Sequence, residues 1–225
     1  MTEGLIKKVI RSKRKTLALQ VTPDASLIIR APERTSLETI QKAVLKKLPW
    51  ILEKQSLARA TYRQPVEREF VNGEGFLYLG EWYKLYVVEG SGTPLVFNSK
   101  EFWLSKKYLS EARQRFEEWY KDEAFDVINR RAKRFAEVAG INYATITITS
   151  AKKRWGSCGP KGTLNFSWRL IMAPLSVIDY VIVHELVHFE ERNHSTRFWQ
   201  KVRVLLPHYQ QARDWLQNNH YLLMP

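Results

Sequence analysis

The chain has 225 residues, of which 44% are hydrophobic and 12% aromatic, a composition typical of a globular protein that argues against a disordered one. Its single cysteine, Cys158, excludes an internal disulfide framework. The sequence contains no run of about 18 apolar residues, so no membrane span is predicted. Lys and Arg number 36 against 23 Asp and Glu, and the resulting net charge of +13 makes nucleic acid a candidate partner.

We predict an α+β fold in two parts, residues 1–100 and residues 101–225. The first part is expected to be an antiparallel, β-rich N-terminal part with one helix. Its predicted elements are, in chain order, strands at residues 16–21 and 27–30 around a turn at residues 23–26, a helix capped by Thr35 or Ser36 that runs through Leu48, a kink or restart at Pro49, and an antiparallel meander across residues 70–97.

The second part is expected to combine helices with a short sheet. Gly140 is expected to stop a long amphipathic helix whose apolar residues follow one stripe. The predicted elements are, in chain order, that helix at residues 106–139, strands at residues 145–149 and 163–168, a mostly buried helix at residues 174–192, a helix from Ser195 that ends before Pro207, and a short final helix.

The buried helix carries the segment His184-Glu185-Leu186-Val187-His188. Two histidines four residues apart project from one face of a helix, so both imidazoles reach a single Zn²⁺ at about 2.0–2.1 Å. Glu185 stands next to the first histidine, where it can accept a proton from an activated water. The pattern predicts a zinc-dependent hydrolase, and ordinary hydrogen-bonded core histidines are the alternative.

A catalytic zinc site needs a third protein ligand, and His194 is our prediction for it. Metzincins have a glycine three residues after the second histidine, and Glu191 replaces it here. We expect the helix to continue to Arg192 and to reverse at Asn193, which tolerates the left-handed conformation. Glu190 and Glu191 are alternative carboxylate ligands.

These residues resemble the YgjP-like metal-dependent hydrolases over most of the chain. The segments that carry the resemblance are Arg14-Lys15-Thr16-Leu17, Arg30-Ala31-Pro32, Arg154-Trp155-Gly156-Ser157-Cys158, residues 164–170, and His184 to His188 continuing to Asn193-His194-Ser195 and Phe198-Trp199. That group is similar to the SprT-like and Wss1-like peptidases, some of which degrade proteins crosslinked to DNA. The resemblance implies that His184, His188 and His194 bind zinc and that Glu185 is the general base. It also implies a minimal zincin-like fold for the second part, with a short twisted sheet, an active-site helix and a backing helix.

The strand above the active-site helix of a zincin pairs with an extended substrate. We expect residues 163–168 to form that edge and to close a loop with Trp155 and Gly156. Gly156 permits close backbone approach, and Trp155 is placed to wall a cleft. The substrate-side residues that this predicts are Trp155, Gly156, Leu164, Asn165 and Phe166. The alternative is that Trp155 and Trp168 are core aromatics.

Two further residues have several interpretations. Cys158 is expected to be a small buried residue, with a fourth zinc ligand and a nucleophile as alternatives. Tyr209 is a candidate for polarising the oxyanion that develops on a substrate carbonyl, or for a role behind the metal ligands. His208 and His220 fall outside the ligand spacing, so surface or capping roles are expected.

The preferred function is therefore a cytoplasmic zinc metallopeptidase that acts on proteins or peptides and has no contact with a membrane. One alternative is a DNA-associated protease acting on DNA-bound or crosslinked proteins, suggested by the charge and by the absence of acids between Glu137 and Asp179. Another is a non-catalytic, zinc-stabilised binding module in which a fourth ligand closes the metal site.

Overall fold

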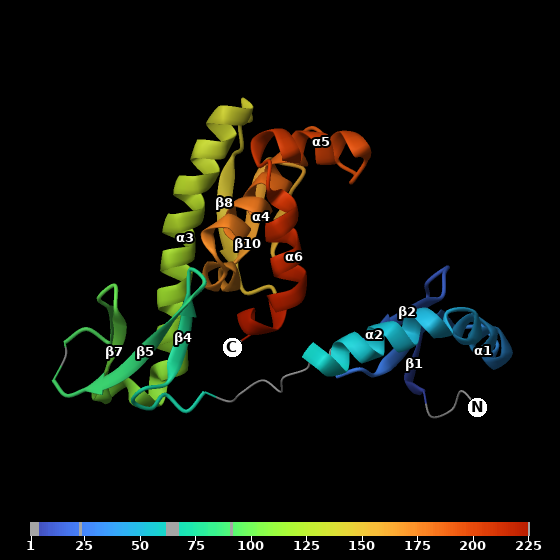
Figure 1. Cartoon of the computed structure of the whole chain (residues 1–225), viewed down its shortest axis with the longest axis horizontal. Coiled ribbons are helices and arrows are strands. Elements are labelled where there is room, and N and C mark those ends of the chain that lie inside the picture. Colours follow the sequence, from blue (N-terminus) through green and yellow to red (C-terminus); the bar gives the residue numbers. More distant parts are fainter. Residues whose placement is uncertain (1–4, 23, 62–67, 91, 225) are drawn as a thin grey trace. The chain divides into compact units, whose positions relative to one another are not determined.

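The computed structural model describes residues 5–22, 24–61, 68–90 and 92–224, which form ten strands in three small sheets and six α-helices (Figure 1). The fold is therefore mixed α+β, as expected. No helix in this described part of the chain has the length and apolar character that crossing a membrane requires. The chain divides into two compact units, Met1–Gln64 and Pro65–Pro225, and each is described by itself.

The first unit is a mixed three-stranded sheet with two helices. Its elements are β1 (Ile6–Ser12), β2 (Ala18–Val21), β3 (Leu27–Pro32), α1 (Leu37–Lys46) and α2 (Leu48–Thr61). The strand order is β1-β3-β2, with β1 parallel and β2 antiparallel to β3, so the expectation of a purely antiparallel part is wrong. Strand β1 is missing from the prediction because its many cations obscure the alternation of apolar residues. The restart at Pro49 is confirmed, since α2 begins at Leu48.

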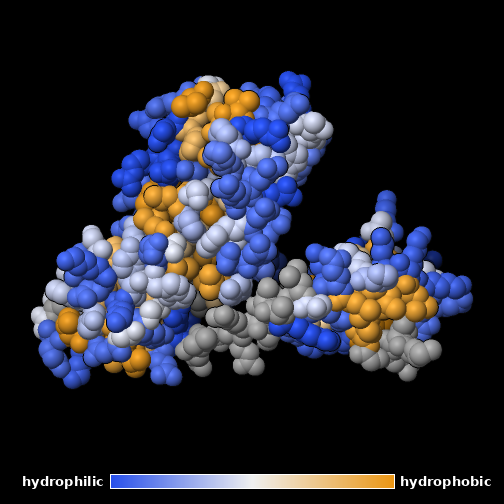
Figure 2. Space-filling model, in the orientation of Figure 1, coloured by the Kyte–Doolittle hydropathy of each residue, from blue (hydrophilic) through white to orange (hydrophobic). Residues whose placement is uncertain are grey.

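Strand alternation builds the core of this unit. Three residues of β3 point to one face and are fully buried against α1 and α2; the cluster is Leu27, Ile29, Ala31, Ile40, Val44 and Ile51. Large apolar side chains also remain on the outside of the two helices, including Leu45 and Leu52 at 56% and 50% exposure, and a hydrophobic area is visible on this unit in Figure 2.

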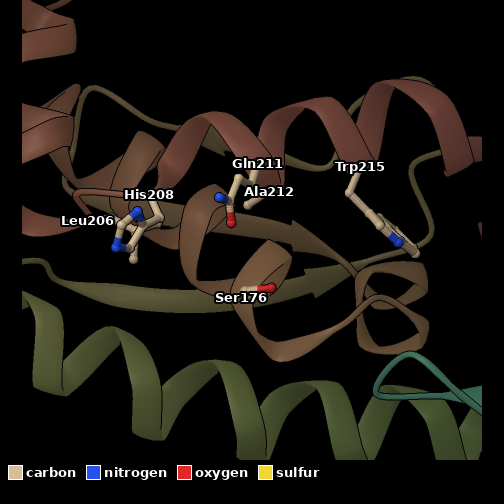
Figure 3. A pocket seen from close by; sticks show the side chains of 6 residues that line it. All are labelled: Ser176, Leu206, His208, Gln211, Ala212 and Trp215. Atoms are coloured by element: carbon tan, nitrogen blue, oxygen red, sulfur yellow. The ribbon is translucent and has the colours of Figure 1, made fainter.

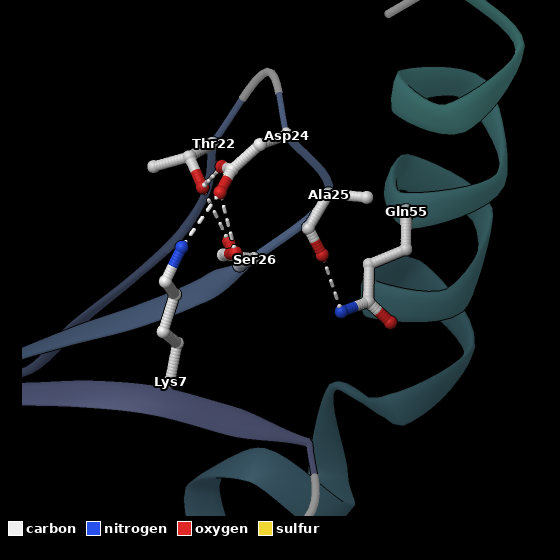
Figure 4. Close-up of polar contacts among 6 residues, drawn as sticks. All are labelled: Lys7, Thr22, Asp24, Ala25, Ser26 and Gln55. Atoms are coloured by element: carbon white, nitrogen blue, oxygen red, sulfur yellow. Dashed lines mark hydrogen bonds and ion pairs between the residues drawn. The ribbon is translucent and has the colours of Figure 1, made fainter.

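The turn between β2 and β3 is held by polar contacts (Figure 4). The carboxylate of Asp24 accepts hydrogen bonds from Lys7 Nζ at 2.8 Å, Thr22 Oγ1 at 2.5 Å and Ser26 Oγ at 2.8 Å. Ala25 adopts a positive φ of 59°, and its carbonyl accepts a bond of 2.8 Å from the buried Gln55 amide. Part of the predicted turn, Pro23, lies outside the described residues.

The second unit begins with a four-stranded sheet: β4 (Gly75–Tyr78), β5 (Glu81–Val88), β6 (Leu95–Phe97) and β7 (Glu101–Ser105). Its order is β4-β5-β7-β6, and β7 runs parallel to β5, so this is not the predicted antiparallel meander. The reason is a hairpin at Asn98, whose Oδ1 accepts the N–H groups of Lys100 and Glu101 at 3.0 Å each. The hairpin inserts β7 between β5 and β6, where Phe102 and Leu104 are fully buried.

This sheet packs with the C-terminal elements of the same unit. The N–H groups of Leu79 and Gly80 donate to the carbonyls of Ile171 and Met172 at 2.9 and 3.0 Å. A Cβ on Gly80, which has a φ of +90°, would lie 2.9 Å from Cγ of Pro174. The structure thus separates its compact units at Gln64 and Pro65, whereas the sequence analysis divided the chain at residue 100.

The remaining elements include a central helix, α4, and the helices and strand that pack around it. They are the 3-10 segment η1 (Lys106–Glu111), α3 (Ala112–Ala139), β8 (Thr145–Thr149), β9 (Gly156–Cys158), β10 (Thr163–Ser167), η2 (Trp168–Met172), α4 (Leu175–Val187), α5 (Thr196–Leu205), α6 (Tyr209–Asn219) and η3 (His220–Leu223). Helix α4 contacts α3, α5, α6 and β9, which explains why it is hydrophobic on nearly every side. The long α3 lies alongside β8 and α4 (Figure 1), and Gly140 caps it with a φ of 66°.

Candidate functional site

Three histidines converge at the C-terminal end of α4. Nε2 of His184 lies 3.2 Å from Nε2 of His188, one turn further along, and 3.0 Å from Nε2 of His194. The potential ligand atoms of all three lie within 4.8 Å of one another. A tetrahedral ion with bonds of about 2.0–2.1 Å separates its nitrogen ligands by about 3.3 Å, so this arrangement needs little change to hold Zn²⁺.

The chain reaches His194 by a route that differs from the prediction. Helix α4 ends at Val187 rather than at Arg192, and the N–H of Glu190 donates to the carbonyl of Val187 at 3.1 Å in a tightened last turn. Asn193 does not reverse the chain in a left-handed conformation, because the described non-glycine residues with positive φ are Ala25, Phe70, Leu79 and Ser99. No glycine is therefore needed at Glu191 to bring His194 back.

The two neighbouring glutamates point to other partners. Glu191 Oε1 forms an ion pair with Arg197 Nε at 2.8 Å and lies 3.9 Å from Lys201 Nζ. Glu190 forms an ion pair with Lys201. These ion pairs occupy the carboxylates that were the alternative metal ligands, and neither carboxylate belongs to the converging group.

Burial favours the neutral forms of His184 and His194. His188 Nδ1 lies 2.9 Å from the carbonyl oxygen of Glu191, which can only accept, so Nδ1 carries a proton and Nε2 is the nitrogen that faces the other two histidines. Burial, and then the charges of His188 and His194, lower the pKa of His184 to about 3. Desolvation also lowers the pKa of His194. Neutral imidazoles with converging lone pairs are the donor set that Zn²⁺ prefers.

One buried nitrogen of this group, Nδ1 of His184, has no hydrogen-bond partner among the described residues. With the single proton of the neutral ring on Nδ1, the lone pair of Nε2 faces the other two histidines. Phe198 packs beneath all three rings at centroid distances of 4.8–4.9 Å and is fully buried, which holds the ring planes in place.

Glu185 extends from α4 and packs against strand β9. The residue is 6% exposed, and burial raises the pKa of its carboxyl group to about 7. The Cys158 N–H and the charge of Arg154 lower that pKa and so act against the effect of burial. A Cβ on Gly156 would lie 2.6 Å from Cγ and 2.7 Å from Oε1 of Glu185, so only glycine fits there. A carboxyl group that titrates near neutral pH is suited to accepting and returning a proton.

A cleft of about 620 Å³ opens beside these groups. Its walls include His184, Glu185 and His188, the whole of β9, the turn that follows it, and Arg192. Strand β10 lies between β8 and β9, and its Leu164 and Phe166 are fully buried. The prediction that residues 163–168 form the open edge is therefore wrong, because both sides of that strand are already paired. The edge at the cleft is β9.

The register of β9 decides which of its backbone groups face outward. Gly159 N–H donates to Thr163 O at 2.7 Å, and Ser167 N–H donates to Trp155 O at 2.9 Å. Because pairing alternates along an antiparallel strand, the odd-numbered residues face β10 and the groups of Gly156 and Cys158 face away. The N–H of Cys158 bonds to Glu185, which leaves the N–H and C=O of Gly156 and the C=O of Cys158 on the open edge.

The other predicted substrate-side residues do not wall the cleft. Trp155 is half-buried and packs on the core. Trp168, 3% exposed, stacks on Tyr120 with 5.7 Å between the ring centroids. Asn165 is half-buried, and its Nδ2 lies 3.4 Å from Ser157 Oγ within the sheet. Of the substrate-side set, Gly156 alone lines the cleft.

Tyr209 belongs to an aromatic column behind the histidines. It is 4% exposed and stacks between Tyr180 at 6.3 Å and Trp199 at 5.4 Å. Trp199 continues the column to His194 at 5.8 Å, and the guanidinium of Arg213 lies 4.8 Å from the Trp199 ring centroid. Tyr209 is not among the residues that line the cleft. No sequence motif includes Arg213, and its position depends on the packing of α6.

Cys158 lies in the cleft wall but outside the histidine group. Its Sγ is 3.9 Å from the carbonyl oxygen of Gly159, and the residue is half-buried. Burial and the nearby Glu185 raise the pKa of this thiol. Neither metal ligation nor attack by a thiolate is favoured there.

A second hollow of about 240 Å³ lies between the start of α4 and helix α6 (Figure 3). Its lining is largely apolar and includes Trp215 together with His208. It shares no residue with the cleft at the three histidines, and His208 is outside the converging group.

Among the comparisons with known proteins, one family model matches most of the chain. A family model described as YgjP-like, metallopeptidase domain matches residues 15–219. The chain is also similar to the metallopeptidase zymogen abylysin of Pyrococcus abyssi, with 18% identity and a TM-score of 0.37 over 40% of this chain and 90% of that one. For the zymogen jannalysin of Methanocaldococcus jannaschii, the identity is 24% and the TM-score 0.32 over 34% and 79% of the two chains. No curated protein matches the chain.

Proposed function

Because the chain belongs to the YgjP-like family of metallopeptidase domains, we propose that it is a zinc-dependent peptidase whose general base is Glu185. The observation that carries this proposal is the convergence of three imidazole nitrogens, two of them from histidines that line the same cleft as a buried carboxyl group. Proteins or peptides are the corresponding substrates.

His184, His188 and His194 would hold one Zn²⁺. When bound, that ion lowers the pKa of a coordinated water towards about 7 and polarises a carbonyl oxygen. Glu185 accepts the proton of the attacking water on its carboxylate and later donates it to the leaving amine. Its contact with Gly156 and its bond from the Cys158 N–H hold the carboxylate at the cleft during both transfers.

Strand β9 would bind the substrate backbone. The outward groups of Gly156 and Cys158 offer one donor and two acceptors to an extended peptide, which would join the sheet as a further strand. Glu185 packs against the same strand. A peptide paired with β9 is thus brought directly to the proton-transfer group.

Replacing Glu185 by glutamine tests this proposal. We expect kcat/KM on an unfolded protein substrate to fall by roughly 10²–10⁴, because the amide cannot accept the proton. Zinc should remain near one ion per chain, as measured by elemental analysis, because the three histidines are unchanged. The matched control is Glu137→Gln on the exposed surface of α3, which should keep activity. Full activity of Glu185→Gln, or wild-type protein that holds no zinc, would contradict the proposal.

A second candidate function is proteolysis of proteins bound or crosslinked to DNA. The first unit favours it, because residues 1–64 contain 14 Lys and Arg against 5 Asp and Glu and so hold +9 of the net +13. Binding of duplex DNA should weaken steeply between 50 and 200 mM salt, and proteolysis should rise when DNA is added. Proteolysis that DNA does not change would remove this candidate.

The remaining alternative is a non-catalytic module that zinc stabilises. It needs a fourth protein ligand to close the site. Cys158 is the nearest candidate in the sequence, but its thiol is outside the converging group and its pKa is raised by burial. A buried carboxyl group at the cleft also has no purpose in a closed structural site. These observations favour the peptidase.

A further inference from the structure

Three cations that line the cleft at the three histidines or are next in sequence to its lining form no ion pair among the described residues. Arg192 lines it directly. Arg154 lies two residues before β9, and Lys161 lies in the turn that follows it; both are exposed. By contrast, the glutamates closest in sequence to Arg192 are already paired, Glu191 with Arg197 and Glu190 with Lys201. The positive charge at the cleft is therefore not neutralised by the protein itself.

One of these cations is next to the site in the sequence, since Arg154 precedes Gly156 by two positions. Side chains alternate along a strand, so Gly156 and Cys158 of β9 share a face. That face is turned towards Glu185, because a Cβ on Gly156 would touch the Glu185 side chain. Arg154 precedes the first residue of β9 by two positions, and Arg192 lines the cleft together with Pro160 and Gly162 of the turn after β9.

The acidic residues of the cleft do not neutralise the positive charge of these cations. Glu185 is the only carboxylate among the described residues that line it. The acid-free stretch between Glu137 and Asp179 includes all of β9 and its flanking loops. Cations in a cleft with low-dielectric walls focus the potential and attract groups of opposite charge.

We propose that this cleft selects polypeptide segments with Asp or Glu within about three residues of the bond to be cut, recognised by Arg154 and Arg192. This inference rests on the proposed peptidase function, because it assumes that a peptide lies along β9. Strand β9 has only three residues, and a strand advances about 3.3 Å per residue. Side chains a few positions on either side of the bond thus reach the two ends where the arginines lie. Charge-assisted pairing with a guanidinium is stronger than pairing with a neutral amide.

The first experiment measures binding, so that it does not depend on turnover. Full-length, zinc-loaded Glu185→Gln is titrated by fluorescence anisotropy with labelled decapeptides that have Asp, isosteric Asn or Lys on both sides of a central apolar pair. At 50 mM salt we expect Kd to be about tenfold lower for the Asp peptide than for the Asn peptide, and the difference to shrink at 500 mM. Equal affinities for the Asp and Asn peptides would overturn the inference.

Charge reversal identifies the residues responsible. Adding Arg154→Glu and Arg192→Glu to the same protein should abolish the preference for Asp and favour the Lys peptide. The control is Arg134→Glu on the exposed side of α3, which changes the net charge without approaching the cleft and should leave the preference intact. If Arg134→Glu removed the preference as completely as Arg192→Glu, the selection would come from overall charge and the inference would be wrong.

Two further outcomes separate this inference from its premise and from a rival partner. Cleavage of a mixed peptide library by the wild type without enrichment of acidic positions would overturn the inference and leave the peptidase intact. Selective binding of acidic peptides without any cleavage would support the inference and contradict the peptidase. If Arg192→Glu weakened the binding of a single-stranded oligonucleotide but not the selection of peptides, these cations would serve nucleic acid and the inference would fail.

Discussion

The two compact units differ in whether their charged side chains are exposed or buried. In the first unit the ion pair of Lys7 with Asp24 is at the surface, with side-chain exposures of 64% and 36%, and Gln55 is the buried polar residue among those described. The second unit buries Arg169, Asp179 and Glu185. Burying an ionisable group costs several kcal/mol unless it is paired. Of these three groups, Asp179 pairs with Arg131 and Arg169 bonds to the Ser150 carbonyl, whereas Glu185 is the one that lines the cleft. The comparison teaches that a buried ionisable group without a pairing partner is a better guide to the candidate site than net charge is.

The largest expected effect concerns the pair of Arg131 with Asp179, which joins α3 to the active-site helix. We expect Asp179→Asn to lower the free energy of unfolding by about 3 kcal/mol, the lower end for buried pairs, because the Arg131 side chain is still 26% exposed. Urea unfolding measures this. Replacing both residues, as in Arg131→Met with Asp179→Leu, should recover most of the loss. A loss as small as that of a surface pair would erase the contrast between the units.

The second effect is a pH dependence of stability in the metal-free protein. The Glu185 pKa rises from the ordinary 4.5 to about 7, so the folded protein binds the proton more tightly than the unfolded chain. The resulting stabilisation is complete below pH 4.5 and is lost as the pH rises through 7, on the order of 3 kcal/mol. Thermal unfolding in a chelator at pH 5, 6, 7 and 8 should show this decline. Glu185→Gln should flatten it, and an unchanged slope in that variant would locate the titrating group elsewhere.

A third effect tests whether tight packing around Glu185 serves activity. Gly156→Ala forces a methyl group against the Glu185 side chain, so the carboxylate must shift. Displacing a reacting group by about 1 Å reduces rates strongly, and we expect kcat/KM to fall at least tenfold while zinc content is unchanged. Gly92→Ala is the control, because nothing lies within 4 Å of a Cβ there. Equal activity of the two variants would show that the contact with Gly156 has no catalytic role.

The smallest effect is expected in the first unit. Lys7→Ala removes an exposed partner of Asp24, which keeps its bonds from Thr22 and Ser26. The unfolding midpoint should fall only slightly, because surface ion pairs contribute little. The difference should disappear in about 1 M salt, where charges are screened beyond about 3 Å. A large, salt-independent loss would mean that this pair behaves like the buried pair of the second unit.

The sequence predicts the residues of the site that are close together along the chain. His184 and His188 lie on one helix face because they are four residues apart, and the position of Glu185 follows because it is adjacent to His184. His194 follows after a short turn, although the conformation of that turn was predicted wrongly, since the last turn of α4 tightens rather than continuing to Asn193.

Pairing between distant segments is what the sequence does not predict. Strand β9 is only Gly-Ser-Cys, without strand propensity, and is recognisable only by its partner β10. The same holds for β7, which inserts between β5 and β6, and for the contacts of Gly80 that attach the four-stranded sheet to the segment before α4. The open edge and the unit boundary both depend on such contacts.

The aromatic column behind the histidines has an optical consequence. Trp199 lies between Tyr209 and His194, at interplanar angles of 15° and 25°. We expect its indole emission to respond to a change in the charge of the His194 ring, and Tyr209 is close enough to pass excitation to it. Loading or stripping zinc should therefore change the tryptophan fluorescence, and Trp199→Phe should remove the change. Such a change would make Trp199 a label-free reporter of metal binding.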